Sequence, residues 1–171
     1  LTDVSANDDK GLPALSGISF SIRSGEILGV AGVAGNGQKQ LVEILTGLRN
    51  VSGGTIRIFD EDKTNKSPLE IINSGVSHIP ADRIARGVAG DMSVANNLAM
   101  KCYRKPPLVK KGFLHPARIL ELARRMIDLF RIDTPTPHTH AKFLSGGNIQ
   151  KTILAREIDA CRGLLVAAYP A

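Results

Sequence analysis

Short apolar patterns typical of β-strands recur through the first half of the chain. Residues 18–23 alternate apolar and polar side chains, which predicts a half-buried strand. Residues 26–31 form a continuous apolar run with the length of a buried strand. Residues 55–59 alternate again, and residues 76–79 form a short apolar run. This half of the chain is therefore expected to contain at least four strands.

Four longer segments place apolar residues at the spacing of an α-helix. They are residues 38–48, residues 93–100, residues 116–130 and residues 146–158. The third begins with a proline, which is favoured in a first helical turn, and the fourth follows a serine that can cap a helix. Residues 163–168 then form a last apolar strand.

The order of these elements predicts an α/β fold with an inserted helical part. Strands and helices alternate near both ends of the chain, whereas the middle is mostly helical. We expect residues 1–83 to form the first part of the core and residues 84–142 a helical subdomain. Residues 143–171 are expected to supply a helix and a strand that return to the core.

Length and composition fit a globular domain. The 171 residues are 43% hydrophobic and 22% charged, and no apolar run approaches the ~20 residues that a membrane-spanning helix needs. Cys102 and Cys161 lack the spacing of a metal or redox site, so no metal site is expected. The chain begins at Leu1 without a methionine and ends directly after an apolar run, so we interpret it as a fragment of a longer protein.

The net charge is +6, and five cations gather in one predicted loop. A basic cluster can bind nucleic acid, anionic lipid or a phosphate-bearing ligand, or can simply be a solvated loop. The chain has two tyrosines, five phenylalanines and no tryptophan, which leaves few side chains for stacking on bases. Nucleic acid is therefore not an expected partner. The clustered cations are Lys101, Arg104, Lys105, Lys110 and Lys111.

A glycine-rich loop lies between the predicted strand at 26–31 and the helix that follows it. This order is the architecture of a P-loop, in which successive backbone amides line a nest for phosphates. A full P-loop continues with lysine and then serine or threonine, which hold phosphate and Mg²⁺. Here Gln38 and Lys39 occupy those two positions. The nest of backbone amides is therefore kept, but the phosphate-binding cation and the metal-binding hydroxyl are lost. The candidate nucleotide-binding residues are Gly32, Gly35, Asn36, Gly37, Gln38, Lys39 and Gln40.

Loss of the lysine should weaken phosphate binding by about ten- to a hundred-fold, since a hydrogen bond to a charged group contributes about 1.5–3 kcal/mol. Lys39 is rotated by about 100° from the missing lysine and should not replace it. One alternative places the Lys39 ammonium where Mg²⁺ would otherwise lie. Another treats the loop as a glycine turn without any ligand.

A second glycine motif opens the predicted helix at 146–158. The Ser145 hydroxyl can cap this helix, and its first amides would point outward together. A helix N-terminus carries about half a positive charge, and glycines let a phosphate approach the backbone. The motif therefore predicts an anion-binding tip. Its residues are Leu144, Ser145, Gly146, Gly147, Asn148 and Gln150.

Residues 144–156 closely resemble the signature motif of ATP-binding-cassette (ABC) ATPases, whose usual form is Leu-Ser-Gly-Gly-Gln. The Asn-x-Gln-Lys continuation resembles the variant of sugar and nucleoside importers, and residues 15–59 and 78–98 resemble other parts of the cassette. The resemblance implies a P-loop NTPase (RecA-like) core with an ABC-type antiparallel β region, an inserted helical subdomain and a truncated C-terminus. It is closest to the second cassette of a nucleoside-type importer ATPase.

Two departures from the family pattern concern catalysis. Ala81 matches the Q-loop glutamine, which in the family senses Mg²⁺, water and the permease. Ala168 and Tyr169 match the aspartate and the catalytic glutamate at the end of the Walker B strand. Without these carboxylates no residue of the chain is expected to act as a general base.

The resemblance also implies partners. Cassettes of this family work in head-to-tail pairs, so the Ser145 tip would cap the γ-phosphate of ATP held, with Mg²⁺, by a second cassette expected on the same natural polypeptide. This chain's own site would be weak or empty. A membrane permease would be a further partner, which implies a cytoplasmic location on the inner face of the membrane.

Other interpretations remain open. One is a non-catalytic ABC-like dimerisation or regulatory module. Another is a soluble ABC protein of DNA repair or translation, although the short insertion argues against it. In the family topology a strand absent from this chain lies between the P-loop strand and the Walker B strand. Exposed strand edges would therefore favour dimerisation or domain swapping.

Overall fold

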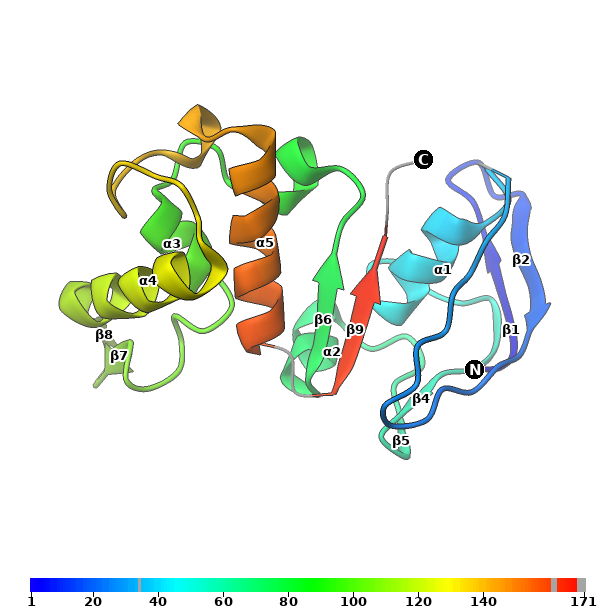
Figure 1. Ribbon diagram of the computed structural model, residues 1–171. Coiled ribbons are helices and arrows are strands. Elements are labelled where there is room, and N and C mark those ends of the chain that lie inside the picture. The colour runs from blue at the N-terminus through cyan, green and yellow to red at the C-terminus, as the bar shows by residue number, and fades with distance from the viewer. Residues whose placement is uncertain (34, 161–162, 169–171) are drawn as a thin grey trace. The chain divides into compact units, whose positions relative to one another are not determined.

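The computed structural model describes residues 1–33, 35–160 and 163–168 (Figure 1). The chain forms two compact units, residues 1–78 with 163–168, and residues 79–160. The sequence analysis placed the first boundary at 83/84 and grouped residues 143–160 with the returning strand. In the structure these residues belong to the second unit, because their helix buries its apolar face among the other helices of that unit.

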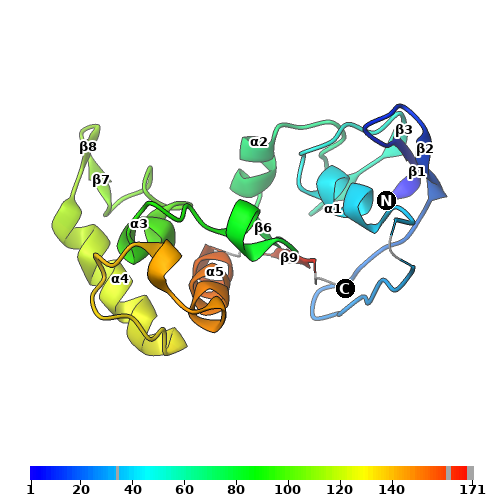
Figure 2. The same ribbon diagram turned by 90° about the horizontal axis from the view of Figure 1, so that it is seen from above.

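The first unit contains an antiparallel sheet. Its strands are β1 (Thr2–Asn7), β2 (Pro13–Ile18) and β3 (Gly53–Thr55), in the order β2-β1-β3 (Figure 2). β1 pairs antiparallel with both neighbours. The periodicity of residues 2–7 and 13–18 did not reveal these strands, but the sheet matches the antiparallel β region that the family resemblance implies.

Helix α1 (Gln38–Leu45) packs on this unit's core. Leu41 and Ile44 are buried in a cluster with Val4, Leu15 and Ile56, as the helical spacing of the leucine and isoleucine predicts. α2 (Pro68–Asn73) begins with a capping box. β6 (Val76–Ile79) and β9 (Leu164–Ala167) pair with each other and run in the same direction (Figure 1). Both strands were predicted.

The prediction of a strand at 18–23 is wrong, and so is that of a buried strand at 26–31. β2 ends at Ile18, and residues 19–33 have no regular secondary structure. Ile27 is 96% exposed and Val30 is 56% exposed. A strand is stable only when a neighbouring strand takes up its backbone hydrogen bonds, and no strand among the described residues pairs with this segment.

The predicted strand at 55–59 is interrupted. β3 ends at Thr55, and β4 (Arg57–Ile58) pairs instead with β5 (Glu61–Asp62). Phe59 and Asp60 have φ values of 53° and 62°, so the chain reverses where the alternating pattern suggested that the strand continues.

The second unit is a group of helices. α3 (Val94–Ala99), α4 (Pro116–Phe130) and α5 (Gly146–Ala160) bury apolar faces against one another. These three helices were predicted at nearly the same bounds. The short helix η1 (Arg83–Gly87) precedes α3, and η2 (Ala141–Phe143) lies between α4 and α5. No helix within the described ranges is long and apolar enough to cross a membrane.

A small hairpin precedes α4. It consists of β7 (Val109–Lys110) and β8 (Phe113–Leu114), which pair antiparallel. The sequence analysis treated this stretch as a loop. Strands of two residues are too short to produce a recognisable alternation of apolar and polar side chains.

Candidate functional site

The glycine loop of the first unit leads directly into α1. Gly35 and Gly37 both have φ values of 91°, and Gly37 precedes the first residue of the helix. A Cβ atom at Gly37 would lie 2.6 Å from the carbonyl oxygen of Ala14, so only glycine fits there. Gly32, Gly35 and Asn36 are exposed, whereas Ala34 lies outside the described residues. The predicted loop-to-helix geometry is therefore present on an accessible surface.

The side chain of Gln38 folds back over this loop. Its Nε2 atom donates a hydrogen bond of 3.1 Å to the carbonyl oxygen of Val33. A Cβ atom built on Gly32 would lie 2.3 Å from the same Nε2 atom, so the Gln38 amide packs directly against the Gly32 backbone. The loop is thus closed by a neutral side chain at the position where a full P-loop has a phosphate-binding lysine.

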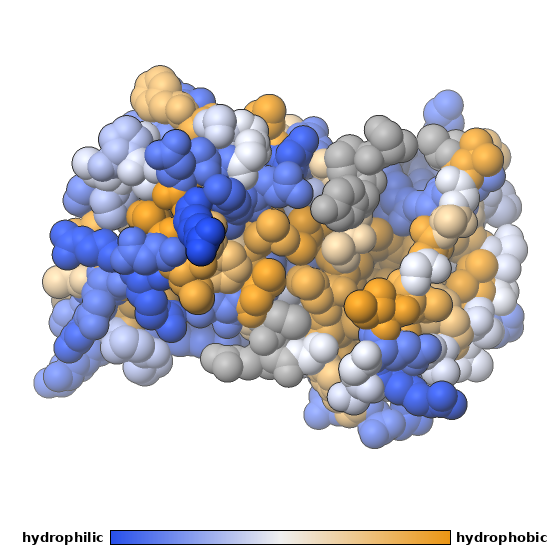
Figure 3. All heavy atoms as spheres, in the orientation of Figure 1, coloured by the Kyte–Doolittle hydropathy of each residue, from blue (hydrophilic) through white to orange (hydrophobic). Residues whose placement is uncertain are grey.

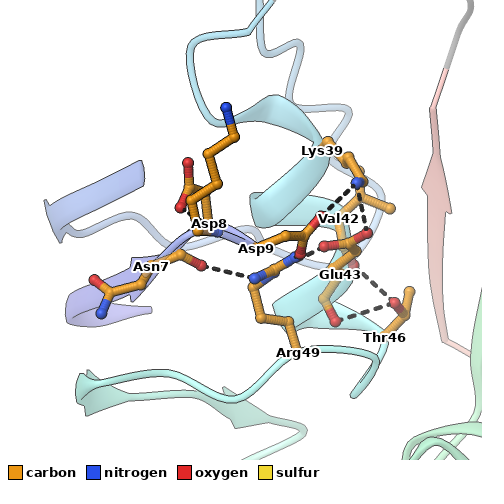
Figure 4. Close-up of polar contacts among 9 residues, drawn as sticks. Asn7, Asp8, Asp9, Lys39, Val42, Glu43, Thr46 and Arg49 are labelled. Carbon is orange, nitrogen blue, oxygen red and sulfur yellow. Dashed lines mark hydrogen bonds and ion pairs between the residues drawn. The ribbon is translucent and has the colours of Figure 1, made fainter. Parts of the chain in front are cut away.

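Lys39 points away from the loop, toward a cluster of charged groups (Figure 4). Its Nζ atom lies 3.3 Å from a carboxylate oxygen of Asp9 and 3.7 Å from one of Glu43. Arg49 contacts the same two carboxylates, and its Nε atom lies 2.8 Å from Glu43 Oε2. The alternative that placed the Lys39 ammonium at a metal position in the loop is therefore not supported.

The charged cluster links α1 to the turn after β1. Arg49 Nη1 donates a hydrogen bond of 2.7 Å to the carbonyl oxygen of Asn7. The hydrogen bond from Arg49, followed by that from Lys39, holds the pKa of Asp9 below its usual value. Asp9 therefore stays ionised at neutral pH, and the cluster keeps Lys39 engaged.

The loop does not fit Mg²⁺ with a triphosphate in the manner of a full P-loop. Gln38 supplies no positive charge, and Lys39 supplies no hydroxyl oxygen for a metal. Within the described residues no group of three or more His, Cys, Asp or Glu side chains could hold a metal ion. Gln40 continues α1 and is half-buried.

The signature segment lies in the second unit. Ser145 Oγ accepts hydrogen bonds from the backbone nitrogen of Asn148 at 3.4 Å and from its Nδ2 atom at 3.0 Å. This confirms the predicted N-cap of α5. Gly146 and Gly147 are exposed, with no atom within 4 Å of a Cβ built on either. The start of α5 therefore offers bare backbone to a ligand.

Surrounding residues hold this tip in place. Leu144 and Ile149 are buried on either side of it. Asn148 Oδ1 accepts a hydrogen bond of 3.0 Å from the backbone nitrogen of Asp133. Gln150 Oε1 accepts one of 2.9 Å from Arg83, which joins α5 to η1. The tip is accessible while its helix is anchored.

Two of the three catalytic positions that depart from the family pattern, Ala81 and Ala168, carry only a methyl side chain. Ala81 is half-buried just before η1, and its neighbour Asp82 caps that helix. Ala168 follows β9 and is half-buried, whereas Tyr169 lies outside the described residues. No carboxylate therefore follows β9 in the part of the chain that the structure describes.

The sequence analysis missed the cluster formed by Asp9, Glu43 and Arg49. Asp9 lies 40 positions before Arg49, and Arg49 lies beyond the end of α1, so no local spacing identifies the cluster. The one available signal was that Glu43 follows Lys39 by four residues, which places them on one helix face.

The chain matches known proteins over nearly its whole length. The ABC transporter family model matches residues 15–167. The guanosine import ATP-binding protein NupO of Bacillus subtilis (strain 168) is 41% identical over 167 residues, which are 98% of this chain and 33% of that protein. The glucose import ATP-binding protein TsgD13 of Haloferax volcanii is 44% identical over 170 residues, covering 98% and 31% of the two chains.

Among solved structures, the ATP-binding cassette MJ0796, in a dimeric post-hydrolysis state bound to ADP and Pi, superposes with a TM-score of 0.76. The match covers 94% of this chain and 68% of that chain at 16% sequence identity, which supports the fold alone. The chain spans about a third of the length of the curated relatives it matches.

Proposed function

The chain belongs to the ABC transporter family, and from this membership we propose that it is an ATP-binding cassette of a sugar or nucleoside importer. The relatives supporting this proposal are import ATP-binding proteins for guanosine and glucose. The whole importer would use ATP hydrolysis to drive uptake through a membrane permease. The cassette would then lie on the cytoplasmic face of the membrane, as a peripheral component.

We propose that this cassette contributes its signature motif to ATP held by a partner cassette. The single observation that carries this proposal is the exposed, capped start of α5, where Gly146 and Gly147 leave the backbone uncovered. Amides at a helix N-terminus and the Ser145 hydroxyl suit the oxygens of a γ-phosphate. ATP and Mg²⁺ would be bound chiefly by the partner.

The chain's own loop would bind nucleotide weakly or not at all. Gln38 closes the loop, and Lys39 is engaged by Asp9 and Glu43. Ala168 offers no carboxylate to organise a metal or an attacking water. These features support an asymmetric pair in which hydrolysis occurs at the partner's site.

The second cassette would be part of the same natural polypeptide. Support comes from the relatives, of which this chain matches only 33% and 31% of the length. A non-catalytic ABC-like dimerisation or regulatory module is the second candidate function, and the closed Gln38 loop favours it for this cassette taken alone.

The test is the ATPase rate of the assembled importer with Ser145→Ala. Ser93→Ala is a matched control, because Ser93 caps α3 in the same unit through a hydrogen bond of 3.2 Å to Asn96. Loss of either cap costs about 1 kcal/mol of stability. Only Ser145→Ala should reduce turnover, by at least ten-fold. Equal ATPase rates for Ser145→Ala and Ser93→Ala would overturn the proposal that the signature motif acts on ATP held by the partner cassette.

A further inference from the structure

The stretch from residue 92 to residue 120 contains no aspartate or glutamate. It holds six lysines and arginines together with His115. The whole chain, by comparison, has 16 acidic and 22 basic side chains. The charge of the protein is therefore concentrated in one part of the second unit. The six cations are Lys101, Arg104, Lys105, Lys110, Lys111 and Arg118.

Four of these cations, Arg104, Lys110, Lys111 and Arg118, line one hollow at the β7–β8 hairpin, whereas Lys101 pairs with Glu157 on α5. The hairpin turns at Lys111 and Gly112, whose φ values are 52° and 83°. Its base is closed by a hydrogen bond of 2.9 Å from the His115 backbone nitrogen to the carbonyl oxygen of Leu108, which is buried. On the face drawn in Figure 3, this end of the second unit is largely hydrophilic.

A cavity of about 800 Å³ opens beside the hairpin. Its lining includes Arg104, Lys110, Lys111, His115 and Arg118, and it includes no acidic residue. Arg118 lies 2.7 Å from Glu121, one turn along α4. Among the described residues, no carboxylate pairs with Lys105, Lys110 or Lys111. The cavity therefore keeps positive charge at Lys110 and Lys111 that no ion pair within the described residues neutralises.

Two large apolar side chains accompany these charges. Phe113 is 77% exposed and Leu114 is 51% exposed, directly after the basic turn. Binding of a small, dissolved phosphate ligand would not require exposed apolar side chains such as these. A membrane surface accommodates both kinds of side chain, because cations attract anionic headgroups while apolar groups enter the boundary of the acyl chains.

We propose that the β7–β8 hairpin docks on a membrane surface rich in anionic phospholipids. Lys110, Lys111 and Arg104 bind headgroup phosphates, and Phe113 and Leu114 enter the interface. RNA is a poorer fit, since the lining of the cavity contains no phenylalanine, tyrosine or tryptophan on which bases could stack, and His115 is its one aromatic ring. This contact goes beyond the proposed transport function, and its test needs neither nucleotide nor a partner cassette.

The test is co-sedimentation of the 171-residue chain with vesicles of phosphatidylcholine alone or mixed with phosphatidylglycerol. Binding is expected only to the mixed vesicles and should weaken as salt rises. Lys110→Gln with Lys111→Gln should reduce binding about 25-fold, at about 1 kcal/mol for each lysine near the surface. Lys10→Gln with Lys66→Gln, which removes the same charge from the first unit, should change it less than two-fold.

A second measurement reports insertion. Because the chain has no tryptophan, Phe113→Trp places a single tryptophan at the hairpin. Its emission should shift to shorter wavelength on the mixed vesicles. Phe143→Trp is the matched control, because Phe143 is 73% exposed in η2 of the same unit, and its emission should not shift.

Three results would overturn the proposal. The first is equal vesicle binding by the two double-lysine variants, which would indicate attraction by overall charge. The second is loss of vesicle binding in millimolar inorganic phosphate at constant ionic strength, which would assign the cavity to a free anion. The third is binding of an RNA oligonucleotide without binding of mixed vesicles.

Discussion

The side-chain amide nitrogen of Gln38 lies 3.1 Å from the carbonyl oxygen of Val33, across the glycine loop that precedes α1. This contact joins the first residue of the helix to the loop before it. A lysine at the same position would bring a positive charge to the loop, whereas the glutamine satisfies a backbone acceptor and stays neutral. The described part of the loop is therefore bridged by a hydrogen bond from the neutral side chain of Gln38.

Restoring the family residues should open this loop to nucleotide. Gln38→Lys with Lys39→Thr returns the lysine and the hydroxyl while leaving the net charge unchanged. The affinity for Mg-ATP should rise by at least ten-fold, since a charged hydrogen bond contributes about 1.5–3 kcal/mol. Isothermal titration calorimetry on the 171-residue chain measures the change.

A matched control for this experiment keeps the composition and moves the charge. Gln40→Lys with Lys39→Thr places the lysine two positions further along α1, on a different face of the helix. Its affinity should stay near that of the original chain. A gain as large as that of the first variant would show that added charge, and not loop geometry, improves binding.

The Asp9 cluster predicts a dependence of stability on pH. The pKa of Asp9 is lowered in the folded chain, chiefly by the Arg49 hydrogen bond, so the folded state binds this proton less readily than the unfolded state. The stabilisation is present above the unfolded pKa of about 3.9 and is lost as pH falls through the lower folded value. Urea midpoints of the original chain should therefore fall between about pH 5 and pH 3 more steeply than those of Asp9→Asn.

Asp60→Asn serves as the control for the acid series. Asp60 is exposed and forms no side-chain ion pair within the described part of the chain. Its substitution should leave the slope of midpoint against pH unchanged. If Asp9→Asn and Asp60→Asn follow the same slope, the Asp9 cluster does not contribute to folding.

Arg156 should be important for the stability of the second unit. It is only 6% exposed, its Nη2 atom donates a hydrogen bond of 2.9 Å to the Gly87 carbonyl oxygen, and its Nε atom lies 2.9 Å from Glu157 Oε1. Arg156→Leu removes the hydrogen bond to Gly87 and one of the cations that contact the buried Glu157 carboxylate, which keeps its contact with Lys101, so the loss should be about 1.5–3 kcal/mol. Chemical denaturation followed by circular dichroism measures the loss.

Arg125→Leu is the comparison for Arg156→Leu. The Arg125 side chain is 62% exposed and lies 3.1 Å from Asp159 at the surface. A surface ion pair contributes at most about 1 kcal/mol. A loss of similar size in both variants would mean that the buried position of Arg156 has no special importance.

The segment at 26–31 should promote self-association. Ile27 and Val30 are exposed apolar residues in a stretch whose backbone has no strand partner among the described residues. Unpaired backbone and apolar side chains favour pairing with another chain. Multi-angle light scattering should detect dimers of the 171-residue chain, and Ile27→Lys with Val30→Lys should shift them to monomers.

Leu12→Lys with Leu69→Lys adds the same charge at apolar positions that are 59% and 52% exposed in the same unit. These residues lie outside the 26–31 segment, so the dimer should persist. A chain that is monomeric without any substitution would contradict the prediction. If both double-lysine variants were monomeric, the loss of the dimer would be due to added charge and not to the 26–31 segment.

The sequence by itself determined the elements whose stabilising contacts are local. The Ser145 cap, the helices α4 and α5 and the strand β6 follow from residues within a few positions of one another. A capping hydrogen bond spans three residues, and an apolar helix face repeats every three or four. These features could be identified before any partner in the fold was known.

Only the tertiary structure decided that residues 26–31 stay exposed and that Lys39 pairs with a distant carboxylate. A buried strand depends on neighbours that local pattern does not specify, and the apolar run stays exposed where the described residues supply none. Lys39 pairs with Asp9, 30 residues away, and Gln38 turns back onto Val33. The Lys39 contact depends on the path of the chain through space, because groups 30 residues apart become neighbours only after folding. The Gln38 contact spans five residues, but it requires the turn of the glycine loop, which the spacing of residues does not specify.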